Sequence, residues 1–275
     1  MSHYTVCVVT EDGNYEKALE PFDENLSVEP YIDETKAQIV ERIKKRKERY
    51  DKDISEGETD SWFEEHYGNV DWNNDDSILR AYMEAWKDDE KFDEEGNHLS
   101  TYNPQSKWDW YSLGGRWGGT LKLKKHASVV KESDLTWTNG FEPVEEGYTD
   151  FAQVKDIDFT PDSKKRKWAE RFWEINVQGK VISEDEYNSG EYRTFYNKKY
   201  YKDKYGSKKE FARCNAEFFT YALLYKGQWF EPGQMGWFGC SDTTKDSEKE
   251  YRLKFREIIS QLKPEDYIAV VDCHI

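Results

Sequence analysis

The sequence predicts an α+β fold in which a central mixed sheet contains both terminal strands and helices pack on that sheet. The chain starts and finishes with short apolar runs, HYTVCVVT at residues 3–10 and YIAVVDCHI at residues 267–275, which are typical of buried strands. Because terminal residues fray unless they are held, we expect the two runs to pair. Several segments between them have helical apolar spacing. The preferred organisation is a single domain, 1–275, with an acidic helical insertion at 51–100.

Three helices are predicted in the first half of the chain. Residues 34–54 place Ile39 and Ile43 among many charged side chains, which is the pattern of an amphipathic helix. Residues 62–67 and 75–91 also show helical spacing, and Asp75 or Asp76 can cap the second of these. Residues 20–33, before these helices, are expected to be irregular, and residues 93–100, after them, to form a polar connector.

The second half of the chain mixes strands and helices. Lys226-Gly227 is a turn signal between two runs rich in aromatic residues, which predicts a hairpin over residues 211–231. Residues 187–205 show no clean period. The other expectations are strand-like structure at 117–130, turns with short strands at 134–158, and helices at 163–177 and 247–262.

Composition excludes several classes of protein. The chain has 275 residues, a net charge of −16 and an aromatic content of 16%. No run of about 18 apolar residues could span a membrane, and no apolar stretch after a basic start indicates a signal peptide. A high aromatic content argues against disorder. We therefore expect a globular cytoplasmic protein, with its oligomeric state left open.

Most of the negative charge lies in residues 51–100, which hold 17 acidic and 4 basic side chains. Such a run is ordinarily a solvated face, and it can also imitate nucleic-acid phosphates or bind cations. Its sign disfavours direct binding of nucleic acid. If the run is functional, its partner is a protein with a basic, nucleic-acid-handling surface. The predicted partner surface consists of Asp75, Asp76, Asp88, Asp89, Glu90, Asp93, Glu94 and Glu95.

Two segments rich in aromatic residues and glycine stand out, YNPQSKWDWYSLGGRWGG at 102–119 and EPGQMGWFGC at 231–240. Flat indole rings beside an arginine and a lysine suit the stacking of a base and the holding of a phosphate. If the two segments meet, they could wall a pocket. The candidate binding residues are Asn103, Lys107, Trp108, Asp109, Trp110, Tyr111, Gly114, Gly115, Arg116, Trp117, Met235, Gly236 and Trp237.

A structural role for the same segments is also open, and it is the favoured alternative. Tryptophan and tyrosine bury about 150–250 Å² each, so a Trp-rich turn can serve as a core plug. Catalysis would use Asp109 as a general base, with Lys107 and Arg116 clamping an anion, although no nucleophile or metal triad accompanies them. We therefore predict no catalytic residue. Asp272 and His274 form a further acid–base pair on paper, for which a structural role is favoured.

Cysteine and histidine spacing indicates neither disulfides nor a metal. Cys7, Cys214, Cys240 and Cys273 are far apart, and no CxxC or HExxH motif occurs. In a cytosolic chain we expect reduced thiols. A zinc site of Cys7, Cys240, Cys273 and His274 is conceivable if the terminal strands adjoin, but it lacks ligand spacing. No metal and no cofactor is predicted.

Four blocks of the sequence resemble a widespread family of uncharacterised bacteriophage and prophage proteins. They are HYTVCVVT, YNPQSKWDWYSLGGRWGG, GQWFEPGQMGWFG and VVDCHI, spread over nearly the whole chain. YNPxSKWDWYxxGGRW is the most specific of them. The resemblance implies a phage-encoded protein that acts inside an infected bacterium. The acidic segment lies between the family blocks.

Three functions follow from these features. The first is a non-enzymatic protein that inhibits a host anti-phage defence protein through its acidic surface, by nucleic-acid mimicry. The second is a small-ligand binder that sequesters a nucleotide immune signal through the Trp/Gly/Arg segment. The third is a nucleotide-processing enzyme.

Overall fold

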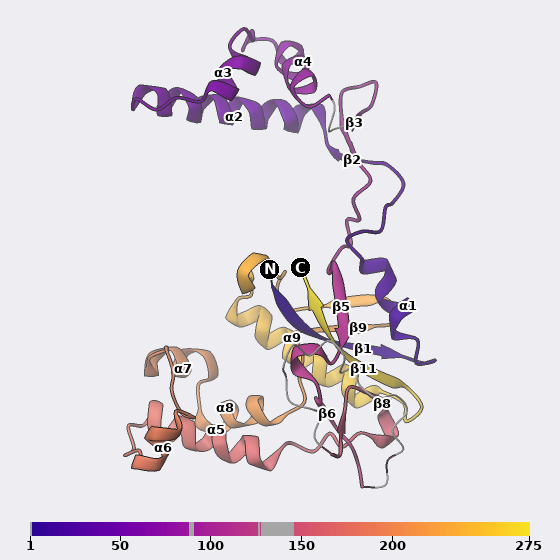
Figure 1. The fold of residues 1–275 in the computed structure, drawn as a ribbon, viewed down its shortest axis with the longest axis vertical. Helices are drawn as coiled ribbons and strands as arrows, with labels where there is room; N and C mark the ends of the chain where they lie inside the picture. Colours follow the sequence, from indigo (N-terminus) through magenta and orange to yellow (C-terminus); the bar gives the residue numbers. More distant parts are fainter. Residues whose placement is uncertain (1, 88–90, 126, 128–145) are drawn as a thin grey trace. The chain divides into compact units, whose positions relative to one another are not determined.

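The computed structural model describes residues 2–87, 91–125, 127 and 146–275 (Figure 1). The chain divides into two compact units. Unit 1 comprises Met1–Asp23 and Gln105–Ile275, and unit 2 comprises Glu24–Pro104. Unit 2 is therefore an insertion between two parts of unit 1.

Unit 1 is built on a six-stranded mixed sheet whose central strands are the two ends of the chain. The strand order is β10-β9-β1-β11-β5, and β8 also pairs with β11. β1 and β11 pair antiparallel, from His3 opposite His274 to Thr10 opposite Tyr267, so the two chain ends are neighbours (Figure 1). The prediction of an α+β fold with both terminal strands in one sheet is confirmed. The strand bounds are β1 His3–Thr10, β5 Trp110–Leu113, β8 Phe151–Gln153, β9 Ala222–Tyr225, β10 Gln228–Phe230 and β11 Tyr267–His274.

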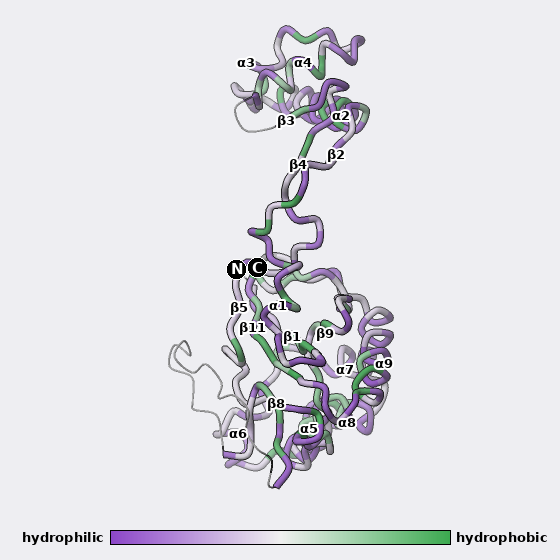
Figure 2. Tube along the Cα trace, turned by 90° about the vertical axis from the view of Figure 1, so that its right-hand side faces the viewer, coloured by the Kyte–Doolittle hydropathy of each residue, from purple (hydrophilic) through white to green (hydrophobic). Residues whose placement is uncertain are grey.

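The sheet separates two hydrophobic cores. Side chains alternate along a strand, so Val8 joins the core under α1 (Tyr15–Leu19) while Val9 joins the core under α9 (Lys245–Gln261). Figure 2 shows hydrophobic and hydrophilic residues alternating along α9, as expected for a helix with one buried face. We call the two sides of the sheet the α1 face and the α9 face.

The remaining helices of unit 1 build a core of their own. α5 packs on α8 through Phe172, Trp173 and Phe211. The predicted helices at 163–177 and 247–262 are confirmed as α5 and α9, and the hairpin at 211–231 is confirmed for β9 and β10. Its first residues were wrongly assigned, because Ser207 caps a helix that runs to Ala216. The remaining bounds are η1 Glu20–Phe22, η2 Gly115–Trp117, β6 Leu121–Lys122, β7 Tyr148–Thr149, η4 Val154–Asp156, α5 Ser163–Asn176, α6 Glu184–Ser189, α7 Lys198–Tyr205, α8 Lys208–Ala216 and η5 Trp237–Gly239.

The strand-like character predicted for 117–130 is reduced to β6 in the described residues, because Gly115–Trp117 forms a turn instead. Within 134–158, residues 146–158 carry the short strands β7 and β8, while 134–145 lie outside the described residues.

Unit 2 is a small helical body with a three-stranded sheet. Its core gathers buried residues from all three helices, among them Ile43, Phe63 and Ile78. The predicted acidic insertion at 51–100 differs from this unit, because the helix over 36–55 packs with the two acidic helices that follow it. The element bounds are β2 Tyr31–Glu34, α2 Lys36–Ser55, α3 Ser61–Tyr67, α4 Asp75–Ala85, β3 Lys91–Phe92 and β4 His98–Ser100. No helix in the described part of the chain is long and apolar enough to cross a membrane.

Candidate functional site

Strand pairing brings two histidines and a tryptophan into one row at the end of the sheet. His3 of β1 and Trp110 of β5 both lie opposite His274 of β11. The two imidazole centroids are 4.9 Å apart, and the Trp110 indole stacks on the His274 ring at 5.1 Å with an interplanar angle of 18°. Because residues 3, 272 and 274 alternate with those of the α1-face core, the row lies on the α9 face.

Each histidine is held by a carboxylate. Nδ1 of His3 lies 2.9 Å from Oδ1 of Asp272, and Nδ1 of His274 lies 2.6 Å from Oδ1 of Asp109. A carboxylate only accepts, so Nδ1–H donates and Nε2 of the neutral ring keeps its lone pair. Within the described residues, neither Nε2 makes a hydrogen bond. The arrangement is that of two orientated imidazoles, each with its Nδ1 edge held by a carboxylate.

A tight glycine turn closes over this row. Gly114 and Gly115 have φ of +70° and +53°, a region that favours glycine. A Cβ on Gly115 would lie 2.4 Å from Cβ of Asp272, and one on Gly114 would lie 2.3 Å from Oδ2 of Asp150. Both glycines are therefore required by close approach as well as by backbone conformation.

Two buried carboxylates clamp the same turn through its backbone. Oδ2 of Asp272 accepts from the Arg116 N–H at 3.1 Å. Asp150, which is fully buried, accepts from the N–H groups of Gly119 at 2.8 Å and Thr120 at 3.0 Å. Since the clamp uses backbone groups, it leaves the side chain of Arg116 exposed. We call His3, Asp109, Trp110, Arg116, Asp272 and His274 the sheet-end site.

Two tryptophans at or near the sheet-end site are accessible to solvent. Trp110 is 46% exposed and Trp117 is 39% exposed, although both belong to a chain segment fixed by buried contacts. Trp108 is buried, by contrast, and its Nε1–H donates to the Leu19 carbonyl. Trp108 also meets Tyr111 edge-to-face in the core of the α1 face. The segment at 102–119 thus combines the two roles that its sequence left open.

The second aromatic–glycine segment lies against the α1 face. Met235 packs on the core of that face, and Ser2 binds the backbone of Gly236 and Gly239. The two segments meet at an ion pair between Lys107 and Glu231, 2.7 Å long, on that side of the sheet.

Because the histidine row is on the opposite face, the segments do not wall one pocket around it. Trp237 begins the short helix η5, and Asn103 belongs to unit 2.

The predicted acidic surface belongs to unit 2, where basic side chains of α2 neutralise part of it. Asp75 pairs with Lys44 and Asp76 pairs with Lys36. Asp93 accepts hydrogen bonds from Asn97, which lowers the pKa of that carboxyl. Glu94 and Glu95 are exposed, while Asp88, Asp89 and Glu90 lie outside the described residues.

The conceivable zinc set is not assembled. Cys7 lies in the α9-face core and Cys273 in the α1-face core, so the sheet separates them. Burial raises the pKa of both thiols, which disfavours the thiolate that a metal needs. Cys240 is exposed. In the described part of the chain no three His, Cys, Asp or Glu side chains gather as metal ligands.

Sequence reasoning missed the partners of the two histidines. It paired Asp272 with His274 because they are two residues apart on one strand, whereas the structure pairs them with His3 and Asp109. The signal was the predicted pairing of the terminal strands, since an antiparallel register places the first histidine opposite the last.

Comparison of the chain with protein-family models, with curated proteins and with solved structures finds no match. The functional argument therefore depends on the chain's own residues.

Proposed function

We propose that unit 1 binds a small ligand that carries both an aromatic ring and a phosphate, of the nucleotide class, at the sheet-end site. The observation that carries the proposal is that Trp110, on β5, and Arg116, in the clamped turn, are both exposed near two carboxylate-bound histidines.

The chemistry of the exposed groups fits this ligand class. A base stacked on tryptophan contributes about 1–3 kcal/mol, and any base offers a suitable face. The guanidinium fork of Arg116 matches a phosphate. Since Asp150 and Asp272 already fix the backbone of the turn, a ligand would have to order only the side chain of Arg116.

Titration calorimetry with a nucleotide panel tests the proposal. We expect saturable heat with at least one nucleotide, and losses of about tenfold or more in affinity for Trp110→Ala and Arg116→Ala. Tyr187→Ala and Arg166→Ala remove an exposed aromatic ring and an exposed arginine elsewhere in unit 1 and should change nothing. Absence of heat with every nucleotide would refute the proposal.

Turnover decides whether the bound ligand is sequestered or processed. Two imidazoles whose Nδ1 atoms are held by carboxylates can serve as general base and general acid on a phosphoester. A nucleotide consumed by the wild type and spared by both His3→Gln and His274→Gln would assign processing. Binding without consumption would assign sequestration, which in a phage-encoded protein would remove an immune signal.

A second candidate is inhibition of a basic host protein by unit 2. It is favoured by the coincidence of charge and structure, because Glu24–Pro104 hold 23 acidic and 11 basic side chains while the rest of the chain is close to balanced. The resemblance to phage proteins suggests a nucleic-acid-handling defence protein as the target.

Affinity purification from an infected host tests this candidate. A captured protein should dissociate as salt rises, because exposed charges are screened over about 8–10 Å near physiological ionic strength. Joint neutralisation of Asp88, Asp89, Glu90, Asp93, Glu94 and Glu95 should abolish capture and inhibition. Unchanged inhibition by that variant would exclude the acidic surface.

A further inference from the structure

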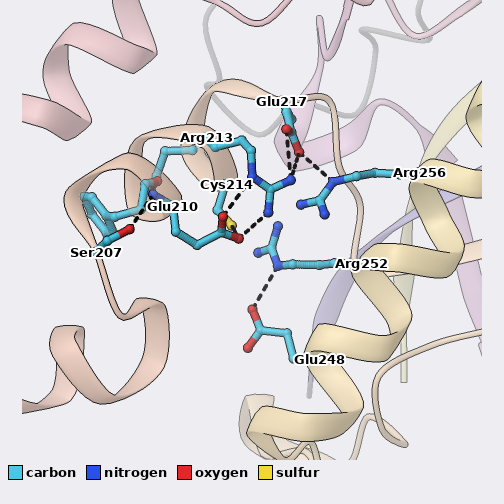
Figure 3. Close-up of polar contacts among 10 residues, drawn as sticks. Ser207, Glu210, Arg213, Cys214, Glu217, Glu248, Arg252 and Arg256 are labelled. Carbon is cyan, nitrogen blue, oxygen red and sulfur yellow. Dashed lines mark hydrogen bonds and ion pairs between the residues drawn. The ribbon is translucent and has the colours of Figure 1, made fainter.

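A cleft of about 500 Å³ lies between α7 and α8 on one side and α9 on the other. Three arginines line it, Arg213 from α8 and Arg252 and Arg256 from successive turns of α9. Figure 3 shows their guanidinium groups facing the same space from the two helices. We call this space the arginine cleft. Its size is that of a small-molecule site.

The three arginines differ in how many of their donors are already used. All three nitrogens of Arg213 are engaged, because Nε and Nη2 donate to Glu210 and Nη1 donates to Glu217 (Figure 3). Arg252 and Arg256 each use Nε alone, Arg252 on Glu248 at 3.2 Å and Arg256 on Glu217 at 2.9 Å. Among the described residues, the Nη groups of Arg252 and Arg256 have no hydrogen-bond partner.

The guanidinium of Arg252 is held in place. It lies over the Phe219 ring at 3.9 Å from the centroid, and its side chain is 16% exposed. One face of the group is thus covered by an aromatic ring, and Glu248 fixes its Nε edge. Its two Nη groups are pre-orientated, which lowers the entropy lost on binding an anion.

The cleft carries an excess of positive charge in a chain that is strongly acidic overall. Six basic side chains line it against four acidic ones, and Glu217, bound by Arg213 and Arg256, adds a fifth carboxylate beside it. Lys204, Lys245 and Lys249 are the lysines among them. Guanidinium groups that converge repel one another, and an anion between them removes that repulsion and satisfies their open donors.

We propose that the arginine cleft binds the phosphate group of a small phosphorylated molecule, with the Nη groups of Arg252 and Arg256 as its principal donors. A tetrahedral phosphate offers several acceptor oxygens to two guanidinium forks, whereas a carboxylate offers two oxygens to one fork. The cleft volume admits a small molecule. This site is separate from the sheet-end site and does not depend on the function proposed there.

Calorimetry on the full chain at low salt tests the proposal, with inorganic phosphate and glycerol phosphate as probes and chloride at equal ionic strength as the blank. Saturable binding of either probe is expected. Arg252→Gln and Arg256→Gln should each weaken it by roughly ten- to hundredfold, the range for a lost charge-assisted hydrogen bond. Arg252→Lys, which keeps the charge and loses the fork, should fall between.

Controls separate binding from folding and from general charge. Arg166→Gln removes one positive charge from an exposed position of α5 and should leave phosphate binding unchanged. Trp110→Ala should also leave it unchanged. If Arg252→Gln melts early, Lys249→Gln tests the same cleft at an exposed side chain that forms no ion pair with any residue the structure describes.

Equal affinity for both probes would assign the site to free phosphate, and tighter binding of the ester would assign it to a phosphorylated small molecule. The proposal is overturned if neither probe gives heat above the chloride blank. It is also overturned if Arg166→Gln weakens binding as much as the cleft variants do.

Discussion

Gly115→Ala is the most direct test of the clamped turn. A Cβ at this position would lie 2.4 Å from Cβ of Asp272 and 2.6 Å from Oγ of Ser112, inside any permitted contact. The backbone cost of a left-handed alanine is about 1–2 kcal/mol, and overpacking adds about 1–3 kcal/mol. We therefore expect the free energy of unfolding to fall by about 2–5 kcal/mol, the sum of these two terms.

Gly227→Ala supplies the matched control. Gly227 sits in the β9–β10 turn with φ of +71°, and an added Cβ there meets no atom within 4 Å. The free energy of unfolding of Gly227→Ala should therefore fall by the backbone cost alone, about 1–2 kcal/mol. Urea unfolding followed by circular dichroism measures both variants. If Gly115→Ala is no less stable than Gly227→Ala, then Asp272 is not packed against the turn as described, and the argument that the backbone at Arg116 is fixed before a ligand binds is lost.

Three further predictions concern the rest of the chain. Asp150→Asn should lower the free energy of unfolding by about 1–3 kcal/mol in urea, because an amide cannot accept at both oxygen positions from the backbone of the turn. Arg171 lowers the pKa of Glu186 from 4.5 to about 2, so the stability that this pair adds should be present above the higher value and lost as pH falls toward the lower one. Urea unfolding at several acidic pH values should show that loss, with a shallower slope for Glu186→Gln. Hydrogen exchange in α2 and α4 should slow as NaCl rises from about 50 to about 500 mM, because salt screens the self-repulsion of unit 2; unchanged exchange would mean that its ion pairs already balance that repulsion.

Elements with a strong hydrophobic pattern could be predicted from the sequence. The pairing of the terminal strands followed from two apolar runs, and α9 followed from the spacing of Tyr251, Phe255 and Ile258. Residues 211–216 were misassigned because the hairpin was predicted from the aromatic run at 218–225 that follows them, whereas the Ser207 cap and the packing of Phe211 on α5 decide for a helix. Tertiary contacts outweigh local propensity in such short segments.

The extent of unit 2 could not be obtained from the distribution of charge alone. A charge count over residues 51–100 includes the acidic side chains of α4 but not their ion-pair partners. Those partners, Lys36 and Lys44, lie in the preceding helix α2. Ion pairs between α2 and α4 join a basic and an acidic stretch in one body. The boundary of a unit is set by which residues pack into its core. Side chains of opposite charge are expected to lie next to each other within one unit.

The two candidate sites were hidden from the sequence for a common reason. The sheet-end site takes His3, Trp110 and His274 from three strands, and its geometry depends on register rather than on any local motif. The arginine cleft takes Arg213 from one helix and Arg252 and Arg256 from another. In both sites, the argument for a ligand depends on hydrogen-bonding groups and aromatic ring faces that stay unused after the neighbouring carboxylates have formed their hydrogen bonds. Unused donors and uncovered ring faces can be identified only when the hydrogen-bond partner of every group is known. The sequence gives the groups, but it does not give their partners.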